Sequence, residues 1–272
     1  CIRDRQRSPH LMDIQTIEHY LNIDSSKYHE PSLEALNYYI KRYMLSVPFE
    51  NINVQNGMPV TVEINDLYDK LINQHRGGFC YEMNHFFGTY LEEKGFTVYR
   101  MSATVEQPNG NRSPEGSHMS LVVPINDVNY VADVGFGDLP LQALPITNID
   151  PTHPVTDITG EFRAISEHEG TYSIQKLEDD SWITRYEARF QPKQIEDFED
   201  MIQYNSQHPD SIFVQQLIVT QPQSFGRATM SSHHLTLSKQ DGKDKYDVTS
   251  DNYRNILKKY FNLDVKIKPL EA

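Results

Sequence analysis

The sequence predicts an α+β protein in which helices dominate the first third and short strands dominate most of the rest. Apolar residues recur at helical spacing up to about residue 95 of the 272-residue chain. Beyond Gly95 the apolar residues fall in short, β-prone segments that turn residues separate. No repeat or low-complexity linker divides these regions, so we expect them to pack as one unit.

Three helices are expected in the first third. Ser32 is a suitable N-cap for the first, whose apolar face comprises Leu33, Leu36, Ile40 and Tyr43. The second is expected over residues 60–75. The third spans residues 80–94 and ends where Gly95 can act as a C-terminal cap.

Most later segments are predicted to be strands. The expected strands of the middle region are 96–105, 118–123, 130–134, 162–165, 172–177 and 182–190. A connecting helix is expected over 191–207. The last part is expected to hold strands 213–220, 227–231, 234–238 and 245–248, and then a terminal helix over 251–261.

The charge of the chain excludes some partners. With 25 Lys and Arg against 38 Asp and Glu, the formal charge is −13, which disfavours nucleic acids and anionic membranes as partners. The sequence has no apolar run of about 18 residues. We therefore expect a cytoplasmic protein.

The cysteines limit other classes of protein. Residues 1–11 precede Met12, are polar, and are interpreted as a leader added during cloning, which would leave Cys80 as the one native cysteine. Neither a disulfide framework nor a Cys-rich zinc site is then possible, and we expect no metal.

Cys80 is the candidate nucleophile. It follows Gly77 and Gly78, which let the backbone turn sharply, and it falls in the first turn of the expected third helix. The free N–H groups and the helix dipole stabilise a thiolate there. The alternative interpretation is a buried, inert cysteine.

His118 and Asp133 are the candidate base and its orienting acid. Folding 118–134 as a hairpin centred between residues 125 and 126 places His118 directly opposite Asp133 on one face. An acid among apolar neighbours needs such a partner. The residues thus favour a Cys–His–Asp triad, although a purely structural His–Asp pair remains the alternative.

Several motifs resemble those of arylamine N-acetyltransferases, in the same order and at similar spacing. They are Val47-Pro48-Phe49-Glu50-Asn51, Arg76-Gly77-Gly78-Phe79-Cys80-Tyr81-Glu82-Met83-Asn84, Ser117-His118 and Asp133-Val134-Gly135-Phe136-Gly137. The resemblance covers nearly all of the chain after residue 11. Several matched motifs in order are more specific than any one motif.

The resemblance implies a helical bundle over 12–95, a β-barrel over 96–196, and an interdomain helix with an α/β lid over 197–272. It implies a papain-like arrangement of Cys80, His118 and Asp133, and a structural ion pair between Arg76 and Glu50. The implied reaction is ping-pong transfer of acetyl from acetyl-CoA to an arylamine, arylhydrazine or N-hydroxyarylamine. Residues matching the CoA channel of relatives are Ser117, Phe136, Gly137, Phe225 and Met230, and those matching aromatics near the acceptor are Phe49 and Phe136.

Some features leave other functions open. Ala103-Thr104-Val105 stands where relatives often have Gly-Arg-Val, so the acceptor preference and the fit of CoA can differ. No Gly-rich phosphate loop is present in the sequence. A cysteine hydrolase or amidase with the same triad is the alternative enzyme. A catalytically silent binding protein is the alternative from another class.

Overall fold

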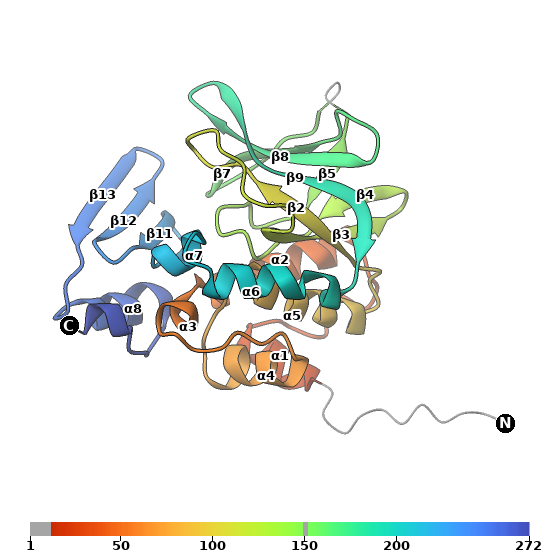
Figure 1. Cartoon of the computed structure of the whole chain (residues 1–272). Helices are drawn as coiled ribbons and strands as arrows, with labels where there is room; N and C mark the ends of the chain where they lie inside the picture. The colour runs from red at the N-terminus through yellow and green to blue at the C-terminus, as the bar shows by residue number, and fades with distance from the viewer. Residues whose placement is uncertain (1–11, 149–151, 272) are drawn as a thin grey trace.

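The computed structural model describes residues 12–148 and 152–271. It has a helical base, a β-barrel above it, and a second sheet with its own helix beside both (Figure 1). This arrangement confirms the α+β class. The expected leader, residues 1–11, lies outside the described residues.

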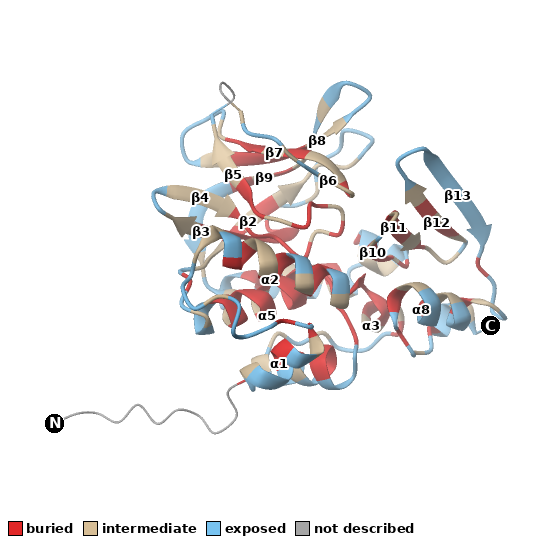
Figure 2. Cartoon of the chain, turned by 180° about the vertical axis from the view of Figure 1, so that it is seen from behind, coloured by how far each residue is buried: buried red, intermediate tan, exposed pale blue. Residues whose placement is uncertain are grey.

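The helical base is built around α2 (Leu33–Ser46) and α5 (Cys80–Glu93). Ser32 caps α2 as predicted, because its hydroxyl accepts a hydrogen bond from the Ala35 N–H at 3.1 Å. The shorter elements are α1 (Ile14–Tyr20), α3 (Ile52–Gln55), α4 (Ile64–Tyr68) and a π-helical turn (Asp69–Asn73). Figure 2 shows buried residues concentrated in α2 and α5, where the helices meet the barrel.

The barrel closes through seven strands in the order β5-β4-β3-β2-β9-β8-β7. Parallel pairing of Ile146 with Ala164 and of Thr147 with Ile165 joins its two ends. Its strands, with the edge strand β6, are β2 (Tyr99–Val105), β3 (His118–Ile125), β4 (Val128–Val131), β5 (Leu144–Thr147), β6 (Val155–Asp157), β7 (Gly160–Ile165), β8 (Thr171–Glu178) and β9 (Ser181–Lys193).

The second sheet has the order β1-β10-β11-β12-β13. Its first strand, β1 (Phe49–Glu50), comes from the helical base, and the others are β10 (Val219–Gln223), β11 (Gly226–Met230), β12 (His234–Lys239) and β13 (Gly242–Asp247). The helix α8 (Tyr253–Phe261) covers one face, followed by a 3₁₀ turn (Lys268–Leu270). The edge strand β13 is exposed along its whole length (Figure 2).

The helix expected over 60–75 is shorter than predicted. The α-helical part begins only at Ile64, after an extended segment whose turn is held by the Glu63 N–H donating to the Thr61 hydroxyl at 3.2 Å. It then passes into the π-helical turn. Hydrophobic spacing indicated the buried face but not this change of helix type.

Two predictions around residue 200 are correct only in part. Strand β9 continues to Lys193, because Pro192 and Lys193 pair with β2, and helix α6 (Glu199–Gln207) begins only after a 3₁₀ turn (Ile195–Phe198). Part of the strand expected over 213–220 is instead the short helix α7 (Ile212–Gln215). Side chains of Asn51 and Gln55 donate to the carbonyls of Phe213, Val214 and Gln216, so these groups need no neighbouring strand.

No helix among residues 12–148 and 152–271 combines the length and the apolar character needed to span a bilayer.

Candidate active site

Cys80 is the first residue of α5, as the sequence predicts, and it is 2% exposed. The Phe79 N–H that precedes it donates to Glu82 Oε1 at 3.3 Å, which helps to fix the start of the helix. The thiol therefore lies at the positive end of a 14-residue helix.

The glycine pair before Cys80 is required by packing. A Cβ at Gly77 would lie 1.8 Å from the Pro48 carbonyl oxygen, and one at Gly78 would lie 2.8 Å from the Glu82 side chain. Neither glycine is among those with positive φ. The two residues thus allow close approach of neighbouring segments, a different reason from the sharp turn expected.

A buried ion cluster supports the same loop. Arg76 donates through Nε to Glu50 Oε2 at 2.9 Å, which confirms the expected ion pair. Its NH2 group also donates to Asn53 Oδ1 at 2.9 Å. Lys70 Nζ lies 2.6 Å from Glu82 Oε2. The cluster therefore connects β1, the loop before Cys80 and the first turn of α5.

His118 and Asp133 pair directly, as predicted, with His118 Nε2 2.5 Å from Asp133 Oδ2. The hairpin register predicted for them is wrong. Ile125 pairs with Val128, so the turn is at Asn126-Asp127, two residues whose positive φ suits a tight hairpin. The strand pairing ends at Val131, and Asp133 reaches the imidazole from the loop that follows β4.

Four donors hold the Asp133 carboxylate. Oδ2 accepts from His118 and from the Tyr186 hydroxyl at 2.8 Å. Oδ1 accepts from Asn84 Nδ2 and from the Gly135 N–H, each at 2.8 Å. A buried charge fully paired in this way has a fixed position, and it fixes the orientation of the imidazole.

Asn84 and Tyr186 are site residues that the sequence analysis did not identify. Asn84 follows Cys80 by one helical turn, so its position on α5 was a usable signal. Its side chain also donates to the Met119 carbonyl and accepts from the Val134 N–H. Tyr186 lies on β9 of the barrel, and only the fold brings it to Asp133.

The site holds an ion pair between His118 and Asp133. Burial alone would lower the pKa of His118, but the charge and hydrogen bond of Asp133, with a smaller contribution from Cys80, raise it from 6.5 to about 10. Burial alone would raise the pKa of the Asp133 carboxyl, whereas the charge of His118 and the hydrogen bonds from His118, Asn84 and the Gly135 N–H hold it below its ordinary value. His118 therefore holds a proton beside Cys80, where it can serve as a general acid.

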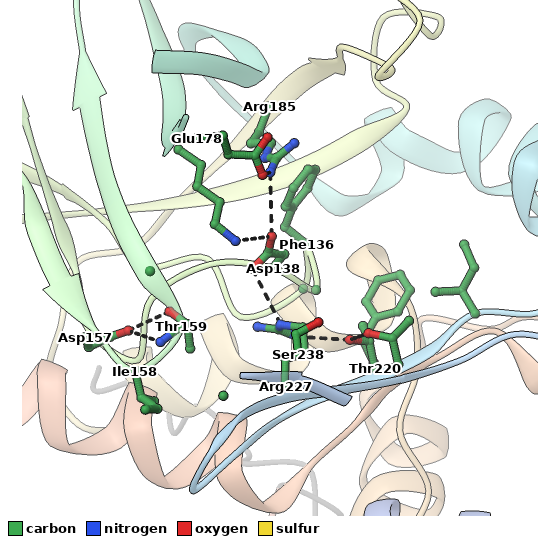
Figure 3. Close-up of a pocket in the computed structure, with 18 of the residues that line it drawn as sticks. Phe136, Asp138, Asp157, Ile158, Thr159, Glu178, Arg185, Thr220, Arg227 and Ser238 are labelled. Atoms are coloured by element: carbon green, nitrogen blue, oxygen red, sulfur yellow. Dashed lines mark hydrogen bonds and ion pairs between the residues drawn. The ribbon is translucent and has the colours of Figure 1, made fainter. Parts of the chain in front are cut away.

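Cys80 and His118 border a cavity of about 910 Å³ between the barrel and the second sheet, whereas Asp133 contacts His118 without lining it. Among the predicted ligand contacts, Phe49, Ser117, Phe136 and Gly137 line it together with Cys80 and His118. The rings of Phe136 and His118 pack edge to face with centroids 5.2 Å apart. Figure 3 shows Phe136, Thr220, Arg227 and the charged residues around Asp138 on the cavity wall.

Phe225 and Met230 are not among the residues that line this cavity. Met230 is fully buried in the core of the second sheet, and Phe225 packs against the same core. Across the described ranges, no group of His, Cys, Asp and Glu side chains has the arrangement of a metal site.

Known proteins resemble this chain in sequence and in fold. Residues 32–270 match a family model described as N-acetyltransferase. An arylamine N-acetyltransferase from Mycolicibacterium smegmatis is 31% identical over 212 residues, which are 76% of this chain and 76% of that protein. The chain belongs to the arylamine N-acetyltransferase family.

Other members of this family of acyltransferases match over nearly the whole chain. The pineal gland isozyme of arylamine N-acetyltransferase from Gallus gallus is 28% identical, covering 96% of this chain and 98% of that protein. A solved arylamine N-acetyltransferase from Bacillus cereus has a TM-score of 0.83 and 25% identity, covering 94% of this chain and 100% of that one. That enzyme is described as having a Cys-His-Glu triad, whereas here Asp133 is the acid that contacts the imidazole.

Proposed function

We propose that the protein transfers acetyl from acetyl-CoA to the nitrogen of an arylamine, arylhydrazine or N-hydroxyarylamine through an acetyl-Cys80 intermediate. The observation that carries this proposal is the position of Cys80 at the start of α5, on the same cavity as His118, whose imidazole is paired with Asp133. Membership of the family gives the acyl chemistry. Phe49 and Phe136 offer aromatic walls for an aromatic acceptor.

In the first half-reaction the Cys80 thiolate attacks the thioester carbonyl of acetyl-CoA. The bond between carbon and the CoA sulfur breaks, and the CoA thiolate can take the proton held by His118. Asp133 keeps the imidazole oriented, because its carboxylate is itself fixed by four donors.

In the second half-reaction the amine nitrogen attacks the carbonyl of acetyl-Cys80. His118, left neutral by the first step, takes the proton that the nitrogen loses, and the Cys80 thiolate leaves. The imidazolium and thiolate are then restored, so no metal is required. The free thiol of Cys80 suits a reducing compartment, and we propose that the enzyme works in the cytoplasm.

Replacing the nucleophile tests the proposal. Cys80→Ala and Cys80→Ser are both expected to abolish acetyl transfer to an arylamine panel while leaving the thermal unfolding transition near that of the wild type. Substantial turnover by Cys80→Ala would contradict the proposal. Acetate produced in place of the N-acetyl amide would support the hydrolase, and a Cys80 no more reactive towards iodoacetamide than a free thiol would support a silent binding protein.

A further inference from the structure

The cavity wall lacks the large excess of acidic residues that the whole chain has. Five of the lining side chains are Lys or Arg and four are Asp or Glu, whereas the whole chain has a formal charge of −13. Three of the cations come from separate strands, Lys176 on β8, Arg185 on β9 and Arg227 on β11. Each faces the single carboxylate of Asp138 (Figure 3).

Asp138 does not satisfy all three cations. Lys176 Nζ is 2.9 Å from Asp138 Oδ2, but Arg227 Nε is 3.5 Å from Oδ1 and Arg185 is 3.8 Å from Oδ2. Arg185 has a nearer partner in Glu178, at 2.5 Å. Counting Glu178 with Asp138, the side chains in contact here hold one positive charge in excess. Asp157 also acts on Arg227 through its charge, but its carboxylate accepts hydrogen bonds from the Leu141 N–H and from the N–H and hydroxyl of Thr159 instead of pairing with a cation.

Arg227 is the cation left most incompletely paired. It is 8% exposed, and its NH1 group donates to the Thr220 hydroxyl at 3.1 Å. Its Nε and NH2 groups are buried and make no hydrogen bond. Arg76 has the same 8% exposure but donates through both Nε and NH2. Because a buried unpaired guanidinium nitrogen is costly, Arg227 is suited to an additional anionic partner.

Arg227 also borders the part of the cavity assigned to substrate. Its partner Thr220 lies opposite Phe49 in the sheet, and a Cβ on Gly137 would lie 3.2 Å from the Thr220 methyl carbon. Phe49, Gly137, Thr220 and Arg227 all line the cavity. A group bound at Arg227 would therefore share this space with the substrate.

We propose that Arg227, assisted by Lys176, forms an oxyanion-binding subsite that holds a carboxylate or phosphate group of a substrate. The identity of the substrates rests on the proposed function, which offers two sources of such a group. One is a carboxylate on the ring of the acceptor, and the other is a phosphate of CoA. The planar guanidinium is suited to either, since both present two oxygens to its N–H groups.

A different role for Arg227 would be to tie β11 to the barrel through Asp138. Loss of that role would destabilise the protein and lower its activity by the same factor with every substrate. An oxyanion subsite predicts a loss confined to the substrate that carries the anion. The two roles are therefore separable by matched substrate pairs.

The kinetic test compares Arg227→Gln with wild type, using Arg254→Gln as the control. Arg254 is an arginine of α8 that pairs with Asp264, and it is not among the residues lining the cavity. Acetyl-CoA and 4-nitrophenyl acetate are matched as donors, since only the first carries phosphate. 4-Aminobenzoate and 4-methylaniline are matched as acceptors, since only the first carries a carboxylate.

We expect Arg227→Gln to lower kcat/KM by about 10- to 100-fold for one anionic substrate and by less than about threefold for its neutral match. A selective loss with acetyl-CoA identifies phosphate as the bound group, and a selective loss with 4-aminobenzoate identifies the carboxylate. Equal effects across both pairs, or no effect, would overturn the proposal. Lys176→Gln should show a smaller loss in the same pair, and it provides the test if Arg227→Gln does not fold.

Binding to the Cys80→Ala protein provides a readout that needs no turnover. Calorimetric titration with CoA, pantetheine, 4-aminobenzoate and 4-methylaniline should show weaker binding of CoA or of 4-aminobenzoate when Arg227→Gln is added. Unchanged affinity for both anions would overturn the subsite. If the wild-type protein transfers no acetyl, the proposed function fails, but these titrations still decide whether the subsite exists.

Discussion

Asp133→Asn changes one atom in the carboxylate that orients His118. Each carboxylate oxygen accepts two hydrogen bonds, so the new NH2 group must face donors whichever way the amide turns. If it faces His118, Nε2 must accept and the ring proton moves to Nδ1, so the imidazole loses the lone pair that it needs as a base. If it faces Asn84 and Gly135, both of those donors lose their acceptor.

The size of both effects follows from this count. A hydrogen bond to a charged group contributes about 1.5–3 kcal/mol, so two lost bonds should lower the unfolding free energy by about 3–6 kcal/mol. Acetyl transfer should fall by about 10⁴-fold, the order expected when the same substitution mis-sets the tautomer of a catalytic imidazole. The loss of rate should therefore exceed what partial unfolding can explain.

The assay is the rate of Cys80 acetylation by 4-nitrophenyl acetate, with urea unfolding measured on the same samples. Glu18→Gln is the matched control, because Glu18 is another buried acid, 4% exposed, that pairs with Lys94 away from the cavity. It should lose stability but keep its acetylation rate. A folded Asp133→Asn protein that acetylates within tenfold of the wild-type rate would refute the orienting role of Asp133.

Three further outcomes are expected. Tyr186→Phe removes a donor to the Asp133 carboxylate, so it should lower the acetylation rate and lower the free energy of unfolding in urea by about 1.5–3 kcal/mol. Tyr172→Phe should change neither quantity, because the buried Tyr172 hydroxyl has no hydrogen-bond partner. Equal effects of the two substitutions would contradict this prediction. Gly135→Ala places a Cβ 2.9 Å from the Cα of Cys80, so it should destabilise the fold and slow the labelling of Cys80 by iodoacetamide. Gly110→Ala is the control: a Cβ there meets nothing within 4 Å, and the substitution should cost only the strain of its φ of +84°. Labelling of the Gly135→Ala protein at the wild-type rate would argue against the close packing. The pKa of His118 is raised from 6.5 to about 10, so the stability that its charged form contributes is fully present below about pH 6.5 and is lost as the pH rises towards 10. The free energy of unfolding should therefore fall more steeply over this pH range in the wild type than in His118→Gln. Parallel curves for the two proteins would be inconsistent with the raised pKa.

Local patterns in the sequence predicted the start of the catalytic helix and the residues that meet at its end. Cys80 could be placed because glycines precede it and helical spacing follows it. His118 and Asp133 could be paired because a buried acid needs a partner, even though the predicted hairpin register was wrong. In the observed register, strands that stayed paired would not place Asp133 opposite His118. The contact forms because Asp133 lies in the loop after β4.

The features that local patterns missed depend on contacts between distant segments. Tyr186 reaches Asp133 from a strand that follows it by 53 residues. The helix at residues 212–215 exists where a strand was expected because Asn51, 162 residues before Phe213, supplies hydrogen bonds to its carbonyls. The unpaired nitrogens of Arg227 likewise become visible only once three strands converge on Asp138.

The most direct test of the central claim is intact-protein and peptide mass spectrometry after mixing the enzyme with acetyl-CoA in the absence of an acceptor. The account predicts the gain of one acetyl group on the peptide that contains Cys80, stable until an arylamine is added and then transferred in stoichiometric amount to the amine nitrogen. No acetylated peptide, or an acetyl group lost to water as fast without the amine as with it, would contradict the account.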